Sequence, residues 1–238
     1  MDIKTRGIVL HSIKYSETSV IVKILTERLG LVSYMVNGVR TSKSAAKAAL
    51  LRPLSLLDLD VSHRENKGLQ RIKEVKRSYS YQSIPFDTIK SCVALFLLEV
   101  IAKSLKEHDV HEELFKYVYD GFISLDTMVV MNNDFHLQFL LQYAAFLGFG
   151  PAGGYSVDTP FFDMQEGTFI AQQDSGSTIL DRIQSEQISH LIHATSATVK
   201  LNRQSRQLLL RCLLKYYQLH LDGFGNLRSP EVLEVLFD

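Results

Sequence analysis

Residues 19–39, SVIVKILTERLGLVSYMVNGV, decide how the first part of this chain folds. Two segments rich in Val, Ile, Leu and Tyr, the residue types typical of β-strands, flank the short sequence Arg28-Leu29-Gly30. Glycine can adopt a positive φ without steric cost, which suits it to a tight turn between strands. The pattern therefore predicts a β-hairpin.

Similar segments on both sides extend this hairpin to five predicted strands. GIVLHSIKY (residues 7–15) precedes it, and LSLLDLDVSH (residues 54–63) and LQRIKEVKRSYSY (residues 69–81) follow it. A longer insertion, residues 38–53, separates the third strand from the fourth and contains a loop or short helix through SAAKAALL. Five strands with an insertion at this place follow the order of an OB-type barrel.

Beyond residue 85 the apolar period changes from two to about 3.6, which is typical of α-helices. A segment at about 150–178, rich in Gly, Ser, Asp and Gln, is expected to be irregular, and Asn202 is a candidate N-cap. The predicted fold class is α+β, with an N-terminal OB-fold β-barrel over residues 1–82 and an all-α helical domain over residues 83–238. The expected helices cover residues 86–107, 111–126, 134–149, 185–195, 202–221 and 229–237.

The charges are distributed unevenly along a chain whose formal net charge is zero. Residues 1–80 contain 15 Lys and Arg against 7 Asp and Glu, whereas the remainder contains 11 against 19. The stretch GVRTSKSAAKAALLRP, residues 38–53, carries four cations and no acid, and the fifth predicted strand adds four more cations. Loops and faces of OB barrels commonly bind nucleic acid, so this pattern indicates a nucleic-acid-binding site. The candidate DNA-binding residues are Arg40, Lys43, Lys47, Arg52, Arg71, Lys73, Lys76 and Arg77.

Aromatic residues are scarce in the predicted barrel. Residues 1–80 contain Tyr15, Tyr34 and Tyr79 but no Phe or Trp, so platforms for base stacking are few. Binding is therefore expected to depend on phosphates, to be indifferent to sequence and to weaken steeply with salt. Because charge does not separate DNA from RNA, an OB-type RNA-binding adaptor is the alternative function.

No pattern in the sequence indicates catalysis or a cofactor. The only cysteines, Cys92 and Cys212, lie in separate apolar helical patterns, which excludes a disulfide framework or a four-Cys zinc site and suits a reducing cytoplasm. Residues 148–153 match G-x-G-x-x-G, but a predicted helix rather than a strand precedes them, so they indicate a helix stop. Two histidine pairs at i, i+3 spacing lack further ligands. We expect a protein that is not an enzyme and holds no metal.

A membrane location is also not expected from the sequence. The longest apolar run, residues 92–102, is interrupted by Glu99 and is too short to span a bilayer. The first twelve residues lack the apolar core of a secretory signal. The expected location is the cytoplasm.

Short motifs along nearly the whole chain resemble, in the same order, the bacterial recombination mediator family RecO. In the second part, LGFGP (residues 147–151) looks like the helix-ending motif of the family, and Leu227-Arg228-Ser229 looks like its C-terminal segment. The motifs of the first part are YSETS (residues 15–19), TERLG (26–30), NGVRTSKS (37–44) and LLRP (50–53).

The resemblance implies an OB fold, a C-terminal helical domain and a function without turnover. It implies that the protein binds single- and double-stranded DNA, anneals complementary strands, and with RecR helps to load RecA onto DNA covered by the single-strand-binding protein SSB. It assigns Arg40 and Lys43 to the DNA-contacting loop. Many members carry a Cys-rich zinc module after the Gly-Phe-Gly-Pro motif, and because no cysteine follows that motif here before residue 176, zinc is expected to be absent.

The resemblance also implies that the acidic, apolar C-terminal tail of SSB docks on the helical domain. That domain is acidic overall, so a local basic patch would have to receive the tail. The densest such patch, and our candidate partner-binding site, is Lys200, Arg203, Arg206 and Arg211.

Overall fold

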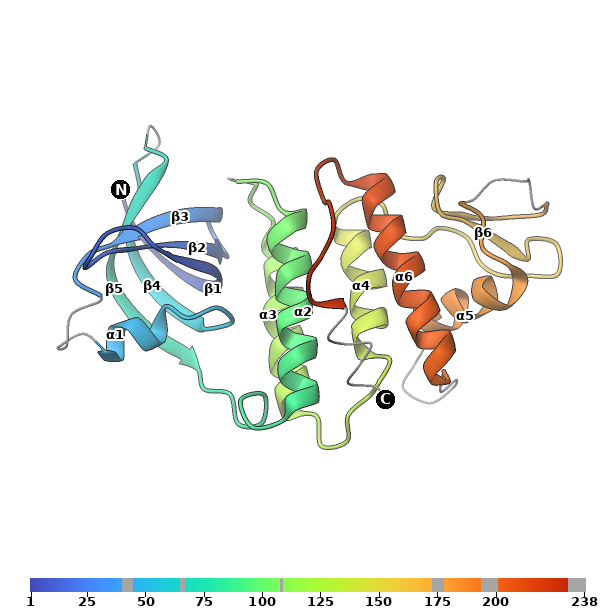
Figure 1. Ribbon diagram of the computed structural model, residues 1–238. Helices are drawn as coiled ribbons and strands as arrows, with labels where there is room; N and C mark the ends of the chain where they lie inside the picture. The colour runs from blue at the N-terminus through green and yellow to red at the C-terminus, as the bar shows by residue number, and fades with distance from the viewer. Residues whose placement is uncertain (40–44, 65–66, 108, 173–177, 194–200, 231–238) are drawn as a thin grey trace. The chain divides into compact units, whose positions relative to one another are not determined.

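The computed structural model describes residues 1–39, 45–64, 67–107, 109–172, 178–193 and 201–230. The chain forms two compact units, Met1–Met128 and Val129–Asp238. The first unit contains a barrel with a short helix in one connection, followed by two longer helices, and the second contains helices and a small hairpin (Figure 1). The predicted domain boundary at residue 82 remains a prediction; the compact units divide the chain further along.

Five strands close into a barrel in the first unit. The strands are β1 (Asp2–Lys14), β2 (Val20–Thr26), β3 (Gly30–Val36), β4 (Leu56–Ser62) and β5 (Leu69–Tyr79). Their order is β1-β2-β3-β5-β4, and an antiparallel pairing of β4 with β1 closes the barrel. Helix α1 (Ala45–Leu50) lies in the predicted insertion between β3 and β4. The α+β fold class with an N-terminal OB-type barrel is confirmed.

The turn of the β2–β3 hairpin requires its glycine. Gly30 has φ of 66°, and a Cβ at this position would lie 2.3 Å from the carbonyl oxygen of Asp109. The Thr26 hydroxyl donates to the Gly30 carbonyl oxygen at 2.8 Å and fixes the turn further. Side chains from alternate positions of the strands fill the barrel, among them Val22, Ile24, Val32, Tyr34, Leu57, Leu59 and Val61.

Helices α2 (Thr88–Ser104) and α3 (Glu112–Thr127) complete the first unit. The buried carboxylate of Asp126, near the end of α3, connects them to the segment that leaves β5. It accepts hydrogen bonds of 2.8 Å from the backbone N–H groups of Gln82, Ser83 and Ile84, and one of 2.9 Å from the Tyr79 hydroxyl. One side chain thus accepts three successive backbone N–H groups of the segment between strand and helix.

The second unit contains α4 (Phe135–Phe146), α5 (Arg182–His193) and α6 (Arg203–His220). Asn202 caps α6 as predicted, because its side chain accepts from the Ser205 N–H at 2.9 Å. The helix predicted over residues 229–237 lies almost entirely outside the described residues. Within the described ranges, no helix is long and apolar enough to cross a membrane.

The segment expected to be irregular contains a hairpin, which corrects the prediction. Strands β6 (Phe161–Asp163) and β7 (Thr168–Ile170) pair in antiparallel register. Each strand has only three residues, too few to show an alternating pattern in the sequence. Phe162 and Phe169 pack together with a ring separation of 5.0 Å, so buried aromatic rings hold the hairpin.

Candidate nucleic-acid interface

The four predicted cations of β5 all lie on the surface of the barrel. An irregularity in the pairing of β5 with β4, which leaves Lys73 without a partner on β4, allows both Ile72 and Val75 to pack against the core, and the charged residues between and after them are exposed. Lys73 is paired with Asp2 at 2.5 Å. No carboxylate of the described residues lies within ion-pair distance of the other three, Arg71, Lys76 and Arg77.

The pair formed by Lys73 changes how both groups titrate. The hydrogen bond from Lys73 lowers the pKa of Asp2, and the same bond raises the pKa of Lys73. Because both groups are exposed to solvent, this pair contributes little to folding. Its main effect is to neutralise one of the four cations on the strand.

The basic stretch is described only in part. Lys47 is half-buried on α1, and Arg52 is exposed in the connection between α1 and β4. Arg40 and Lys43 lie outside the described residues. The role of all eight residues in DNA binding stays a prediction, and the structure supplies positions for six of them.

Arg52 and Arg77, which are distant in sequence, line one cavity of about 400 Å³ in the first unit. Its walls come from the α1–β4 connection, the end of β5, the segment after β5, and α2. Sequence reasoning did not find this cavity, because it depends on how α2 packs. The basic stretch and the last strand thus meet at one place.

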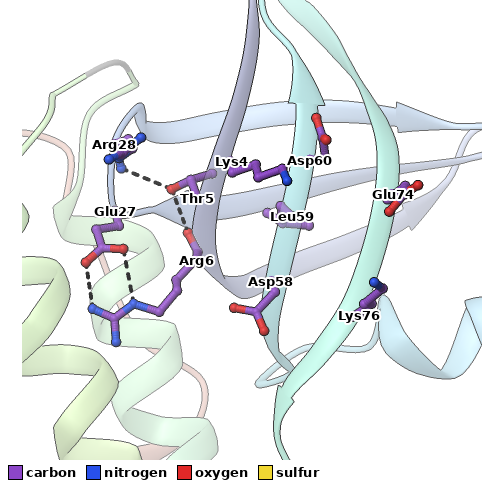
Figure 2. A pocket seen from close by; sticks show the side chains of 10 residues that line it. All are labelled: Lys4, Thr5, Arg6, Glu27, Arg28, Asp58, Leu59, Asp60, Glu74 and Lys76. Carbon is purple, nitrogen blue, oxygen red and sulfur yellow. Dashed lines mark hydrogen bonds and ion pairs between the residues drawn. The ribbon is translucent and has the colours of Figure 1, made fainter.

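A second, larger hollow of about 480 Å³ is lined by residues of β1, the β2–β3 turn, β4 and β5 and has mixed charge (Figure 2). Its lining includes the carboxylates of Glu27, Asp58, Asp60 and Glu74 beside the cations of Lys4, Arg6, Arg28 and Lys76. These carboxylates repel phosphate and offset the nearby cations. The hollow is therefore a poor site for a polyanion.

Arg6 in this hollow is occupied by a structural contact. Its guanidinium donates to both oxygens of the Glu27 carboxylate, at 3.1 and 2.6 Å, and lies 4.8 Å from the ring centre of Tyr119 on α3. The hydrogen bond between Arg6 and Glu27 raises the pKa of Arg6 and lowers the pKa of Glu27. This cation joins the barrel to α3 and is not available to phosphate.

The three tyrosines of the barrel have different environments. Tyr15 is 60% exposed, whereas Tyr34 is fully buried inside the barrel. The hydroxyl of Tyr79 is held by Asp126. Tyr15 is thus the only one of the three that is largely exposed, while Tyr79 is half-buried and lines the cavity beside Arg52, so the barrel offers few stacking platforms.

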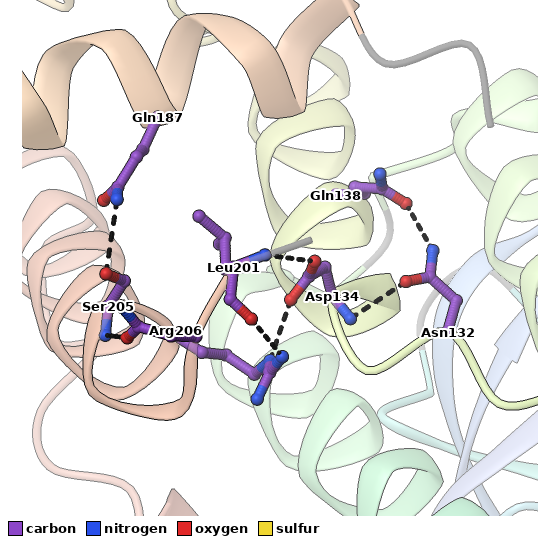
Figure 3. A network of polar contacts seen from close by, with 8 residues as sticks. Asn132, Asp134, Gln138, Gln187, Leu201, Ser205 and Arg206 are labelled. Atoms are coloured by element: carbon purple, nitrogen blue, oxygen red, sulfur yellow. Dashed lines mark hydrogen bonds and ion pairs between the residues drawn. The ribbon is translucent and has the colours of Figure 1, made fainter. Parts of the chain in front are cut away.

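The candidate partner-binding residues do not form a single exposed patch. Arg203 and Arg211 are exposed on α6, and Lys200 lies outside the described residues. Arg206 is buried, and its Nε donates to Asp134 at 2.8 Å while its Nη2 donates to the Leu201 carbonyl oxygen at 2.8 Å (Figure 3). The guanidinium of Arg206 therefore faces the interior of the second unit.

The two histidine pairs at i, i+3 spacing are His108/His111 and His190/His193, and the contacts of His111 and His190 are local. The Nδ1 atom of His111 accepts from the Leu114 N–H at 3.1 Å and caps α3. His190 lies 3.8 Å from Glu186 on the same helix. Among the described residues, no three His, Cys, Asp or Glu side chains gather as metal ligands.

The closed five-stranded barrel followed by helices defines an OB-type protein with an added helical part. Residues 1–81 match the family model described as "Recombination protein O N terminal", and residues 85–230 match "Recombination protein O C terminal". The chain therefore belongs to the RecO family of DNA repair and recombination proteins.

Relatives are similar in sequence to this chain over nearly its whole length. It is 36% identical over 245 residues to the DNA repair protein RecO of Bacteroides fragilis, covering 99% of each chain. It is 37% identical over 239 residues to that of Flavobacterium psychrophilum, covering 100% of each chain. The DNA repair protein RecO of Porphyromonas gingivalis is 30% identical over 247 residues, again covering 100% of both. The recognised resemblance is confirmed.

Proposed function

We propose that this chain is a recombination mediator that binds single- and double-stranded DNA and anneals complementary strands. With RecR, it helps to load RecA onto DNA covered by SSB. The observation that carries the proposal is the set of exposed barrel cations Arg52, Arg71 and Arg77, none of which is paired with a described carboxylate. Membership of a family of DNA repair proteins supports it.

Exposed cations and few stacking rings suit annealing for a physical reason. Two complementary strands repel each other through their phosphates, and a basic surface that binds both backbones lowers this repulsion. Because few aromatic rings are open on the barrel, the bases of a bound strand are left free to pair. In this proposal the protein acts by binding and does not turn over a substrate.

The proposed partner surface for the SSB tail is on the helical domain. Arg203 and Arg211 are exposed on α6 and suit an acidic peptide. Arg206 contributes indirectly, because its ion pair with Asp134 holds the start of the same helix. Binding of the tail peptide to the full chain, compared with the Arg203→Ala/Arg211→Ala variant, is the measurement that checks this assignment; equal affinities for both would reject it.

Annealing of complementary oligonucleotides, with and without SSB, tests the mediator role directly. We expect the protein to accelerate pairing and to retain this effect when SSB covers the strands. Competition between DNA and RNA of equal length separates this function from that of an RNA-binding adaptor. A strong preference for RNA, or no acceleration, would contradict the proposal.

Replacement of four cations tests the DNA site. In the variant Arg40→Ala/Lys43→Ala/Lys47→Ala/Arg52→Ala, single-strand affinity and annealing should fall together. The slope of log affinity against log salt should flatten by up to about three, at roughly 0.7 per phosphate contact. We expect stability to change little, because Arg52 is exposed, Lys47 is only half-buried, and surface substitutions typically cost within about 0.5 kcal/mol each.

A matched variant outside the barrel provides the control. Lys103→Ala/Lys106→Ala/Lys116→Ala/Lys215→Ala removes the same charge from helices and their connections. We expect a much smaller loss of affinity and an almost unchanged salt slope. If both quadruple variants lose the same affinity and slope, the basic stretch is part of a diffuse field and not the site.

A further inference from the structure

The cavity of about 400 Å³ next to Arg52 and Arg77 falls within the size range of small-ligand sites. Its floor and walls are largely apolar and include Leu54, Ile84 and Leu95. Leu95 is 51% exposed, although it is a large apolar residue on a helix. The cavity thus combines an apolar interior with two arginines.

The backbone beside the cavity is strained. Residues 52–55 form a turn in which the Ser55 N–H donates to the Arg52 carbonyl oxygen at 3.2 Å, with Pro53 in the second position. Leu54 occupies the third position with φ of 75°, where such turns normally require glycine. Its N–H donates to the Val9 carbonyl oxygen at 2.8 Å, and its own carbonyl accepts from the Tyr81 hydroxyl at 3.0 Å. Strain of this kind is concentrated at functional sites.

Two tyrosines form a fixed aromatic wall of the cavity. The rings of Tyr79 and Tyr81 meet edge to face, with centres 5.5 Å apart and planes at 75°. Hydrogen bonds to Asp126 and to the Leu54 carbonyl hold the two hydroxyls. Because both rings are positioned before any ligand enters, binding a planar group here costs little ordering of side chains.

The charge of the cavity favours an anion beside the planar group. None of the lining residues is acidic, in contrast to the hollow of Figure 2, which has four carboxylates. Arg52 and Arg77 are exposed, and no carboxylate of the described residues is paired with either. Arg77 lies near the end of β5, where the strand borders the cavity. The two arginines are therefore the cations available to phosphates beside the cavity.

We propose that this cavity receives one unpaired base of a bound single strand, with Arg52 and Arg77 holding the flanking phosphates. This inference rests on the proposed function. A base has the planar apolar faces that suit the tyrosines and leucines, and its phosphates suit the arginines. A duplex cannot use the cavity without unpairing a base. The site therefore gives the protein a preference for single strands that a surface of cations alone does not give.

The substitution Ala49→Trp tests the cavity without a change of charge. Ala49 is half-buried, lies on the short helix α1 and lines the cavity, so an indole there fills the space. Single-strand affinity should fall by between about fivefold and a hundredfold, the range that loss of one stacked base produces. Duplex affinity and both salt slopes should stay unchanged, because the phosphate contacts remain.

Controls separate loss of the base from other effects. Leu208→Trp places the same ring at an exposed apolar position of α6 and should leave both affinities unchanged. A strand made entirely of abasic sites should bind the unmodified protein and Ala49→Trp equally. Should Ala49→Trp fail to fold, Leu95→Ala removes part of the apolar wall from an exposed helix position and should reduce single-strand affinity in the same direction.

Several results would overturn the inference. One is an equal loss of single-strand and duplex affinity in the folded variant, and another is an abasic strand that binds the unmodified protein as tightly as a normal strand. A third is an acidic, apolar peptide whose binding is lost in Ala49→Trp while single-strand affinity is kept. If the unmodified protein binds single- and double-stranded DNA and Ala49→Trp changes neither affinity, only the cavity assignment fails. If the unmodified protein binds neither DNA, the proposed function fails as well.

Discussion

Arg77 in the barrel and Arg206 in the second unit carry the same charge in opposite environments. Arg77 is exposed, and no described carboxylate is paired with it. Arg206 is only 8% exposed and donates to Asp134 and to the Leu201 carbonyl. The first guanidinium can offer its charge to a phosphate, whereas the second holds the chain that enters α6. Counting cations in a sequence therefore does not locate a polyanion site; their burial and pairing do.

The environment of Arg206 explains why its charge is tolerated inside the unit. The side chains of Asp134 and Arg206 are 8% and 10% exposed, and their closest atoms are 2.8 Å apart. Asp134 also accepts from the Leu201 N–H at 3.4 Å, so the pair belongs to a small network (Figure 3). Losing both charges is often tolerated, but losing one leaves the other buried and unpaired.

The largest expected effect follows from breaking this pair. Arg206→Ala should destabilise the second unit by roughly 3–5 kcal/mol, because the Asp134 carboxylate stays buried without its partner. The double variant Asp134→Leu/Arg206→Met should recover most of that loss, since it removes both charges and keeps apolar volume. Urea unfolding of the full chain measures both.

Arg77→Ala is the matched substitution on the barrel. Its unfolding free energy should stay within about 0.5 kcal/mol of the parent, while its single-strand affinity falls. If Arg77→Ala destabilises the protein as much as Arg206→Ala does, the contrast between the two arginines is wrong.

Asp126 in the first unit gives the next effect and depends on pH. Burial favours its neutral form, but hydrogen bonds from the N–H groups of residues 82–84 outweigh burial, and the pKa of Asp126 lies below the ordinary value of 3.8. The unfolded state thus binds this proton more readily than the folded state. The stability contributed by Asp126 is present above about pH 4 and is lost as pH falls through the folded pKa.

Asp126→Asn should lower stability at neutral pH by roughly 1–3 kcal/mol, because an amide cannot accept all four hydrogen bonds as a carboxylate does. As pH falls, the free energy of unfolding should also decrease less in the variant than in the parent. Denaturant unfolding from neutral pH down to about pH 3 checks both expectations. If the unfolding free energy of the variant falls with acid as steeply as that of the parent, other carboxylates determine the decline.

Much of the barrel could be predicted from the sequence, because local patterns determine it. The apolar segments on both sides of Gly30 became β2 and β3, and the insertion after β3 holds a short helix as expected. Asn202 capped α6 because the signal for an N-cap is local. Each of these features depends on residues close together in the chain.

Features that depend on distant contacts were missed. Arg206 lies three, four and seven positions before Leu209, Leu210 and Leu213, on the apolar face of α6, so its spacing indicated burial even though its partner Asp134 could not be foreseen. The cavity beside Arg52 needs α2 in place and has no local signal. The sequence shows which side chains are charged, but it only partly shows whether each charge is buried or paired.

The smallest expected effect is that of a metal chelator on the second unit. Phe162 of β6 is 1% exposed, and its ring centre lies 5.8 Å from that of Tyr216 on α6. His220 stacks on Phe149 with ring centres 5.0 Å apart, and its Nε2 lies 2.9 Å from the Met164 carbonyl oxygen. These rings and hydrogen bonds tie the hairpin to the helix by the contacts of an ordinary core.

Since these contacts do what zinc ligands do in small metal modules, excess chelator should leave the melting temperature unchanged. Elemental analysis of the purified protein should find less than one zinc per chain. Phe162→Ala shows that the measurement can detect loosening of the hairpin, because removing a buried Phe should cost about 3–5 kcal/mol. Stoichiometric zinc, or a melting temperature that falls with chelator while the barrel stays folded, would mean that the aromatic cluster is not sufficient and that ligands elsewhere in the chain complete a site.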